Sequence, residues 1–133
     1  MLIYFDSVIV IYLLDHAGPL QARALNRLAA LVAAGDQVAV SDLVRLECRV
    51  KPLAQGDAAK LAAFDGFFSR SDVRRVPITT AVFDRATVIR ARRGWKLADS
   101  LHLAAALESA CDRFLTNDGR LAGFTDLAVE VLP

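Results

Sequence analysis

The sequence predicts an α/β fold, a three-layer α/β/α sandwich around a central, mainly parallel five-stranded sheet. Two observations lead to this prediction. Short β-prone runs alternate with pairs of helical segments along the 133 residues, which is typical of a parallel sheet covered on both faces. Apolar residues make up 55% of the chain, above the usual share, as expected when strands are buried on both faces.

The length and composition narrow the class of protein. We expect one domain covering residues 1–133, because the chain has a typical domain length and shows no linker or repeat. No apolar run is long enough to span a bilayer, and the first residues lack the basic region of a signal peptide. Cys48 and Cys111 are isolated, which argues against a disulfide framework or a zinc site. These features favour a cytoplasmic protein, and the net charge of +1 means that any nucleic-acid surface must be local.

Five short runs rich in β-branched and aromatic residues give the strands. The first is apolar and stops at Asp6, and the fourth stops at the turn Asn117-Asp118-Gly119. The predicted strands are residues 2–5, 37–40, 73–76, 113–116 and 127–132.

Six helical segments lie between the strands, with a short seventh before the last strand. Gly35 is expected just past the end of the second helix, and Ser41 or Asp42 should cap the third. Lys51-Pro52 should end or kink the third helix, and Asp15-His16 should lie in a solvated loop. The six predicted helices are residues 8–14, 20–34, 43–50, 58–69, 81–93 and 97–109.

Four acidic residues mark the expected functional site. Asp6 and Asp118 directly follow predicted strands, Glu47 lies in the third helix, and Asp99 lies in the first turn of the last long helix. In open parallel sheets, ligands bind outside the carboxyl ends of the strands where the strand order reverses. If the first and fourth strands are neighbours there, the carboxylates of Asp6 and Asp118 share one crevice.

This set of acids points to metal-dependent hydrolysis. Several carboxylates in one cleft repel each other unless a cation neutralises them. Mg²⁺ and Mn²⁺ prefer oxygen ligands, and the absence of Cys or an obligatory His argues against zinc. A bound divalent ion acidifies a water molecule that can attack a phosphodiester. Asp6, Glu47, Asp99 and Asp118 are therefore the expected catalytic residues and metal ligands.

Each acid also has an ordinary structural explanation. Asp6 can cap a helix, Glu47 can face solvent, Asp99 can interact with a helix dipole, and Asp118 can be a turn residue. Only their joint placement favours a site.

Other residues close to the acids in sequence can support them. Ser7 and Thr116 flank proposed ligands and can hydrogen-bond to a carboxylate, while His102 shares a helix face with Asp99. Trp95 could stack on a base, although a packed Trp explains it equally well. Basic residues that suit a phosphate backbone, or simply solvated helix ends, are Arg45, Arg49, Lys51, Arg92, Arg93 and Lys96.

Four segments, in this order, resemble the PIN-domain ribonucleases, and more narrowly the VapC-type toxins of type II toxin–antitoxin pairs. The segments are IYFDS (3–7), VSDLVRLE (40–47), LADSLHLAAA (97–106) and FLTND (114–118). The resemblance implies a Mg²⁺- or Mn²⁺-dependent endoribonuclease in which Asp6, Glu47, Asp99 and Asp118 match the family's acidic quartet. It also implies a homodimer, an RNA substrate and a cognate antitoxin protein. Val8 departs from the family pattern, which often has a small polar residue at this position.

Two other functions stay open. A catalytically silent PIN-like binding module would be expected to have lost at least one acid, and all four are present. A receiver-like or other Mg²⁺-dependent phosphoryl-transfer domain needs a second acid beside Asp6 or a lysine at a late strand end. Ser7 follows Asp6 instead, and no lysine follows Val76 or Leu115, which counts against this alternative.

Overall fold

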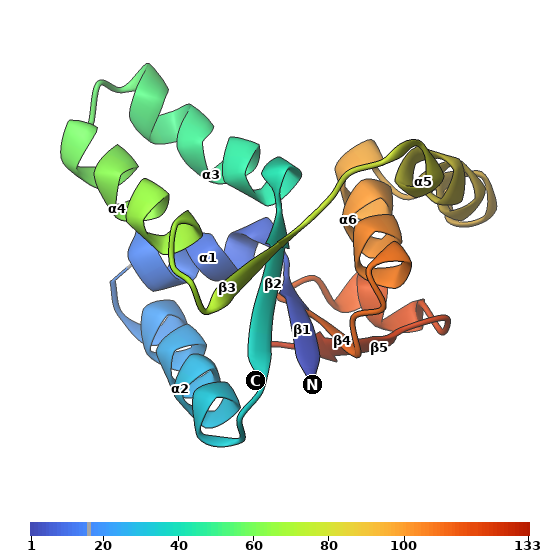
Figure 1. Ribbon diagram of the computed structural model, residues 1–133, viewed down its shortest axis with the longest axis horizontal. Helices are drawn as coiled ribbons and strands as arrows, with labels where there is room; N and C mark the ends of the chain where they lie inside the picture. Colours follow the sequence, from blue (N-terminus) through green and yellow to red (C-terminus); the bar gives the residue numbers. More distant parts are fainter. Residues whose placement is uncertain (16) are drawn as a thin grey trace.

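The computed structural model describes residues 1–15 and 17–133, and within them five strands form one sheet (Figure 1). The strand order is β3-β2-β1-β4-β5, and all four neighbouring pairs are parallel, so the predicted parallel sheet is confirmed. The strands are β1 (Leu2–Phe5), β2 (Gln37–Ser41), β3 (Val73–Val76), β4 (Arg113–Thr116) and β5 (Ala128–Val131).

Helices cover the sheet on both sides. In Figure 1, α1 to α4 lie to the left of the sheet, while α5 and α6 pack together on the right. The helices are α1 (Ser7–Leu14), α2 (Pro19–Ala33), α3 (Asp42–Ala54), α4 (Ala58–Phe68), α5 (Thr80–Arg93), α6 (Leu97–Glu108) and the 3₁₀ helix η1 (Gly119–Gly123). No helix in the described part of the chain is long and apolar enough to cross a membrane.

The core forms where apolar strands meet the small residues of α6. Tyr4 and Phe5 of β1 and Phe114 of β4 are completely buried, as expected for central strands covered on both faces. Residues 103–106 of α6 are also buried, and three of these four residues are alanines. These small side chains let α6 approach the sheet closely, which brings its first turn, with Asp99, to the edge of the sheet.

One local expectation differs from the structure, and a second falls partly on a residue that the structure does not describe. The third helix does not stop at Pro52 but continues to Ala54, since Pro52 lies in the last turn, where its missing N–H removes only one helical hydrogen bond. Pro52 is buried, and this packing favours its place in the helix. At the expected Asp15-His16 loop, Asp15 caps the end of α1, and His16 lies outside the described residues.

The strand order reverses at β1, which has β2 on one side and β4 on the other. Phe5 pairs with Leu115 in register, and the Asp6 backbone N–H donates to the Leu115 carbonyl at 2.9 Å. The segments that follow β1 and β4 therefore emerge side by side at the carboxyl edge of the sheet. This arrangement confirms the predicted neighbourhood of the two strands and brings Asp6 and Asp118 to one crevice.

Candidate active site

Four segments that are distant in sequence bring the four predicted acids to one cleft. Asp6 caps α1, Glu47 lies within α3, Asp99 lies in the first turn of α6, and Asp118 caps η1. The cleft is open to solvent and has a volume of about 530 Å³. Its lining residues are Asp6, Ser7, Val8, Ile11, Tyr12, Glu47, Asp99, Asn117, Asp118 and Gly119.

The Asp6 carboxylate is held in one orientation by two hydrogen bonds. One oxygen, Oδ1, accepts from the Ser7 backbone N–H at 2.8 Å, and the other, Oδ2, accepts from the Thr116 hydroxyl at 2.7 Å. Thr116 is completely buried, and its oxygen also accepts from the Asp118 backbone N–H at 3.1 Å. Thr116 therefore links the ends of β1 and β4. Its hydrogen bond to the Asp6 carboxylate is the contact that its position in the sequence suggested.

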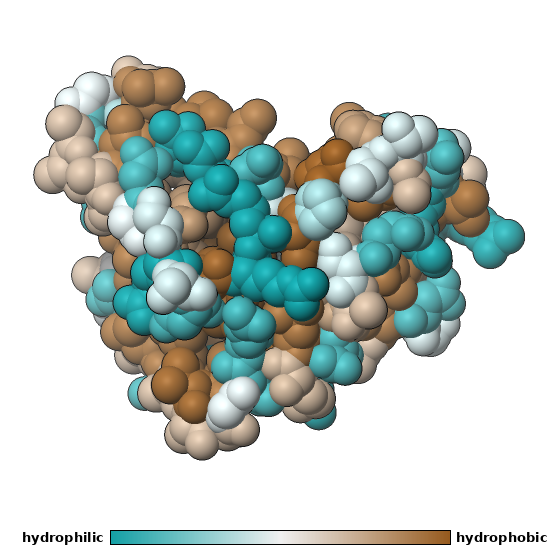
Figure 2. All heavy atoms as spheres, in the orientation of Figure 1, coloured by the Kyte–Doolittle hydropathy of each residue, from teal (hydrophilic) through white to brown (hydrophobic). Residues whose placement is uncertain are grey.

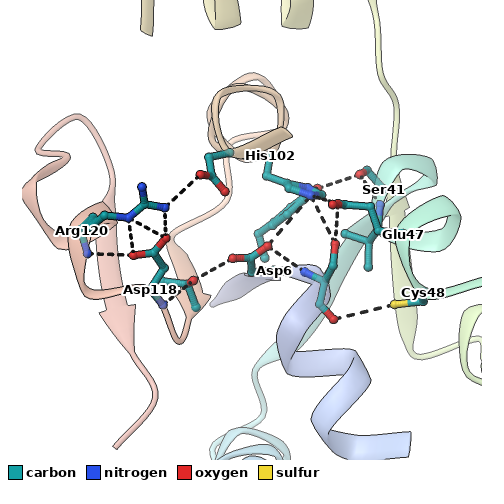
Figure 3. Close-up of polar contacts among 12 residues, drawn as sticks. Asp6, Ser41, Glu47, Cys48, His102, Asp118 and Arg120 are labelled. Atoms are coloured by element: carbon teal, nitrogen blue, oxygen red, sulfur yellow. Dashed lines mark hydrogen bonds and ion pairs between the residues drawn. The ribbon is translucent and has the colours of Figure 1, made fainter. Parts of the chain in front are cut away.

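The Glu47 carboxylate is contacted by Ser7 and His102 (Figure 3). The Ser7 hydroxyl donates to Glu47 Oε1 at 2.7 Å, and the same oxygen contacts His102 Nε2. Burial raises the pKa of Glu47, but the hydrogen bonds from His102 and Ser7 outweigh it, so that the pKa lies below its ordinary value. Glu47 therefore stays ionised in the cleft although it is half-buried.

His102 connects the cleft to a buried chain of polar groups. Its Nδ1 hydrogen-bonds with the Tyr4 hydroxyl at 2.8 Å, and that hydroxyl hydrogen-bonds with Ser41 Oγ at 2.7 Å. The Tyr4 ring stacks on Phe114, with 5.4 Å between the ring centroids. Sequence reasoning missed Tyr4 and assigned Ser41 only a capping role. The available signal was one phenol in an otherwise apolar central strand.

Asp99 is the acid with the least compensation. Its Oδ2 is buried and has no hydrogen bond among the described residues, because the nearest cation, Arg120 Nη2, is 3.5 Å away, too far for a good hydrogen bond. Burial raises the pKa of Asp99, and the neighbouring Asp6 and Asp118 carboxylates raise it further. This carboxylate is therefore short of positive charge.

Asp118 is paired with an arginine that the sequence analysis did not identify. Arg120 Nε lies 3.0 Å from Asp118 Oδ1 and 3.1 Å from Oδ2, and its Nη2 contacts Oδ2 as well (Figure 3). The hydrogen bond from the Arg120 side chain lowers the pKa of Asp118. An arginine two residues after a turn aspartate was the only signal in the sequence, and it is not specific.

The residues of the cleft fit a hard divalent cation by their chemistry. The donors are carboxylate oxygens, no cysteine lines the cleft, and the buried Asp99 oxygen lacks a partner. As the side chains stand, however, no three Asp, Glu, His or Cys side chains in residues 1–15 and 17–133 converge closely enough to hold a metal. Glu47 is in direct contact with His102, and Asp118 is in direct contact with Arg120.

The basic residues near the acids are partly engaged elsewhere. Arg49 pairs with Asp65 at 2.8 Å, and Lys51 lies 3.8 Å from Asp15. The Arg93 guanidinium lies 5.2 Å from the centroid of the Trp95 ring, which also packs near Phe124. These contacts favour packing over base stacking as the role of Trp95.

Comparisons with known proteins agree with this architecture. Residues 3–127 match the family model described as the PIN domain, whereas no curated protein sequence matches the chain. A VapBC2 structure from Rickettsia felis bound to a promoter DNA fragment is 16% identical, with TM-score 0.81 and 100% of both chains covered. A toxin–antitoxin complex from Klebsiella pneumoniae is 21% identical, with TM-score 0.74 over 98% of this chain and 97% of that one. The Mycobacterium tuberculosis toxin VapC20, which cleaves the sarcin–ricin loop, is 17% identical, with TM-score 0.74 over 95% of this chain and 98% of that one.

Proposed function

Because the chain belongs to the PIN-domain family, we propose that it is a Mg²⁺- or Mn²⁺-dependent endoribonuclease and the toxin of a toxin–antitoxin pair. The observation that carries this proposal is the meeting of four carboxylates, from four separate segments, in one open cleft at the carboxyl edge of the sheet. Residues 1–133 act as one nuclease domain, and the site of action is the cytoplasm, where RNA is accessible.

The proposed ligands are Asp6, Asp99, Asp118 and Glu47. A divalent ion bound there would supply an acidified water molecule and offset the charge of the scissile phosphate. Ser7 and Thr116 each donate to one oxygen of the Asp6 carboxylate and so hold it in a fixed orientation at the cleft. Glu47 is kept ionised by His102 and Ser7, so this carboxylate can accept a proton from an attacking water molecule.

The partners follow from the same family. The similar structures include a toxin–antitoxin complex and a toxin that cleaves the sarcin–ricin loop, which supports an antitoxin protein and a structured RNA as partners of this chain. We also propose a homodimer, because α3 exposes an apolar stripe at helical spacing. Leu46, Val50 and Leu53 are 57%, 56% and 66% exposed, which is unusual for three such residues on one helix.

The nuclease proposal is tested by RNA cleavage with the purified, folded protein. Structured RNAs, including a ribosomal hairpin, should be cut in Mg²⁺ or Mn²⁺, and EDTA should abolish the cut. Asp6→Asn and Asp99→Asn should each reduce cleavage by at least about a hundredfold, because they remove ligand charge. Asp84→Asn is the matched control, since Asp84 is an exposed acid on α5 outside the cleft.

Two results would count against the proposal. Intact RNA under all metal conditions, with protein free of antitoxin, would favour the catalytically silent binding module. Variants of Asp6 and Asp99 that cut as well as the parent chain would show that another site performs the reaction.

A further inference from the structure

One cation of the chain itself lies between two of the acids. The guanidinium of Arg120 makes several contacts with the Asp118 carboxylate, and its Nη2 also lies 3.5 Å from the buried Asp99 Oδ2 (Figure 3). One planar group thus faces oxygens of two proposed ligands that come from η1 and α6. A divalent ion shared by these ligands needs the same oxygens.

We infer that Arg120 is a resident counter-cation of the acidic cluster, and that a divalent ion must displace its guanidinium in order to bind. This inference rests on the proposed metal-dependent function. The inference adds a regulatory property to that function: Arg120 sets the metal concentration at which the site binds its ion.

Electrostatics supports displacement over simultaneous binding. A guanidinium and a metal ion are both positive, so at the same carboxylate oxygens they repel each other and compete for the same lone pairs. The cluster also needs a positive charge, because Asp99 already faces the carboxylates of Asp6 and Asp118. When either the guanidinium or the metal ion leaves, the other must therefore neutralise the negative charge of the cluster.

The surroundings of Arg120 allow its side chain to move. The side chain is 56% exposed, and among the described residues its polar contacts are only those with Asp118 and Asp99. A swing of the guanidinium into solvent therefore breaks no other polar contact in the described part of the chain. The turn itself does not depend on the guanidinium, because Asp118 Oδ1 accepts from the Arg120 backbone N–H at 3.0 Å.

The test compares Mn²⁺ binding by calorimetry for the parent chain, Arg120→Ala, Arg120→Lys and the control Arg23→Ala. Arg23 is exposed on α2, so its removal changes the net charge equally without touching the cleft. Arg120→Ala should bind Mn²⁺ roughly two- to fivefold more tightly than the parent, as expected for the loss of a competing, partly exposed charge pair. Arg120→Lys should fall between them, because it keeps the charge and loses the planar fork.

Thermal unfolding gives a second measurement that does not need catalysis. In EDTA, Arg120→Ala should unfold at a lower temperature than Arg23→Ala, because the acids lose their counter-cation. Added Mn²⁺ should then raise its unfolding temperature by more than it raises that of the parent.

The outcomes separate this inference from the proposed function. Equal or weaker Mn²⁺ binding by Arg120→Ala, with clear binding by the parent, would overturn the inference and leave the metal site intact. Binding by neither protein at millimolar Mn²⁺ would overturn the metal site, and the inference with it.

Discussion

The Tyr4 hydroxyl lies at the centre of a buried chain of polar groups that ends at Glu47. It hydrogen-bonds with both Ser41 Oγ and His102 Nδ1, and His102 Nε2 contacts Glu47. Because all groups of this chain except the Glu47 carboxylate are buried, each depends on its neighbours for hydrogen bonding. A central strand residue thereby fixes the orientation of an acid in the cleft.

Replacement of Tyr4 by Phe should reveal this dependence. The variant keeps the ring that stacks on Phe114 but leaves His102 Nδ1 without a partner, and Ser41 Oγ keeps only the Val44 backbone N–H. We expect a loss of about 1–2 kcal/mol in the free energy of unfolding, the usual cost of leaving a buried polar group unpaired. Urea unfolding measures this loss, and RNA cleavage should fall severalfold as Glu47 loses its fixed support. An equally stable and active variant would contradict the proposed role of this buried row of polar groups.

Asp99 gives a prediction of opposite sign. Because its partly buried carboxylate is repelled by Asp6 and Asp118, Asp99→Asn should stabilise the protein in EDTA by about 0.5–1 kcal/mol at neutral pH. Urea unfolding of the two proteins in EDTA checks this gain. Loss of stability would show that Arg120 already compensates Asp99 in full, despite the 3.5 Å distance.

At this scale the sequence predicts residues whose role follows from their position along the chain. Asp6 and Asp118 directly follow strands, and Ser7 and Thr116 are their neighbours in sequence, so simple topology brings all four together. Tyr4 and Arg120 were missed for different reasons. The partners of Tyr4 are 37 and 98 residues away, and only the folded structure brings them close. The direction of the Arg120 side chain depends on the turn of η1.

Among the elements, the edge strand β5 is tied to α2 by one ion-pair group. Arg27 of α2 donates from Nε and Nη2 to the Glu130 carboxylate at 2.5 and 3.0 Å, and Arg113 of β4 adds a contact at 3.3 Å. The Arg27 and Glu130 side chains are only 17% and 23% exposed, so solvent screens the pair less than a surface pair. Hydrogen bonding from Arg27 lowers the pKa of Glu130.

This pair should make stability depend on pH in a defined direction. Because the pKa of Glu130 is lower in the folded state than its ordinary value of 4.5, its contribution is present above that value. The contribution is lost as the pH falls through the lowered folded pKa. Glu130→Gln should therefore cost about 1 kcal/mol at pH 7 and almost nothing at strongly acidic pH, as measured by urea unfolding.

Glu108→Gln is the comparison for this experiment. Its partner Arg85 is 44% exposed, so the same removal of a carboxylate charge should cost less at pH 7. An equal cost for both variants, or a cost for Glu130→Gln that persists at low pH, would argue against the ion pair as the cause.

The element boundaries show where sequence patterns are sufficient. Ser41 caps α3, one of the two capping residues that the sequence offered, and Gly94 ends α5 with φ of 67°, as is typical of glycine. Pro52 is the exception, because local steric rules predict an end or a kink, whereas its burial favours continuation to Ala54. Tertiary packing of this kind cannot be deduced from the residues around the proline.

At the scale of the whole molecule, apolar side chains are exposed in distinct areas of the surface. Figure 2 shows apolar surface along the upper edge, over α3, and again over the upper end of α6, where this helix begins. Exposed apolar side chains of α3 are Leu46, Val50 and Leu53. Phe83 of α5 and Leu97 of α6 are also exposed and line a separate shallow hollow. Part of the 55% apolar content therefore lies on the surface and not in the core.

The proposed homodimer makes this surface testable. The parent chain should elute as a dimer in size-exclusion chromatography with light scattering, and Val50→Glu combined with Leu53→Glu should give a monomer with an unchanged circular dichroism spectrum. The two positions are 56% and 66% exposed, so added charge should not disturb the core of one subunit, whereas across an interface it would be buried without a partner. Val32→Glu is the matched control, since Val32 is 62% exposed on α2, away from this surface. A parent chain that is monomeric at micromolar concentration, or a double variant that stays dimeric, would contradict an interface on α3.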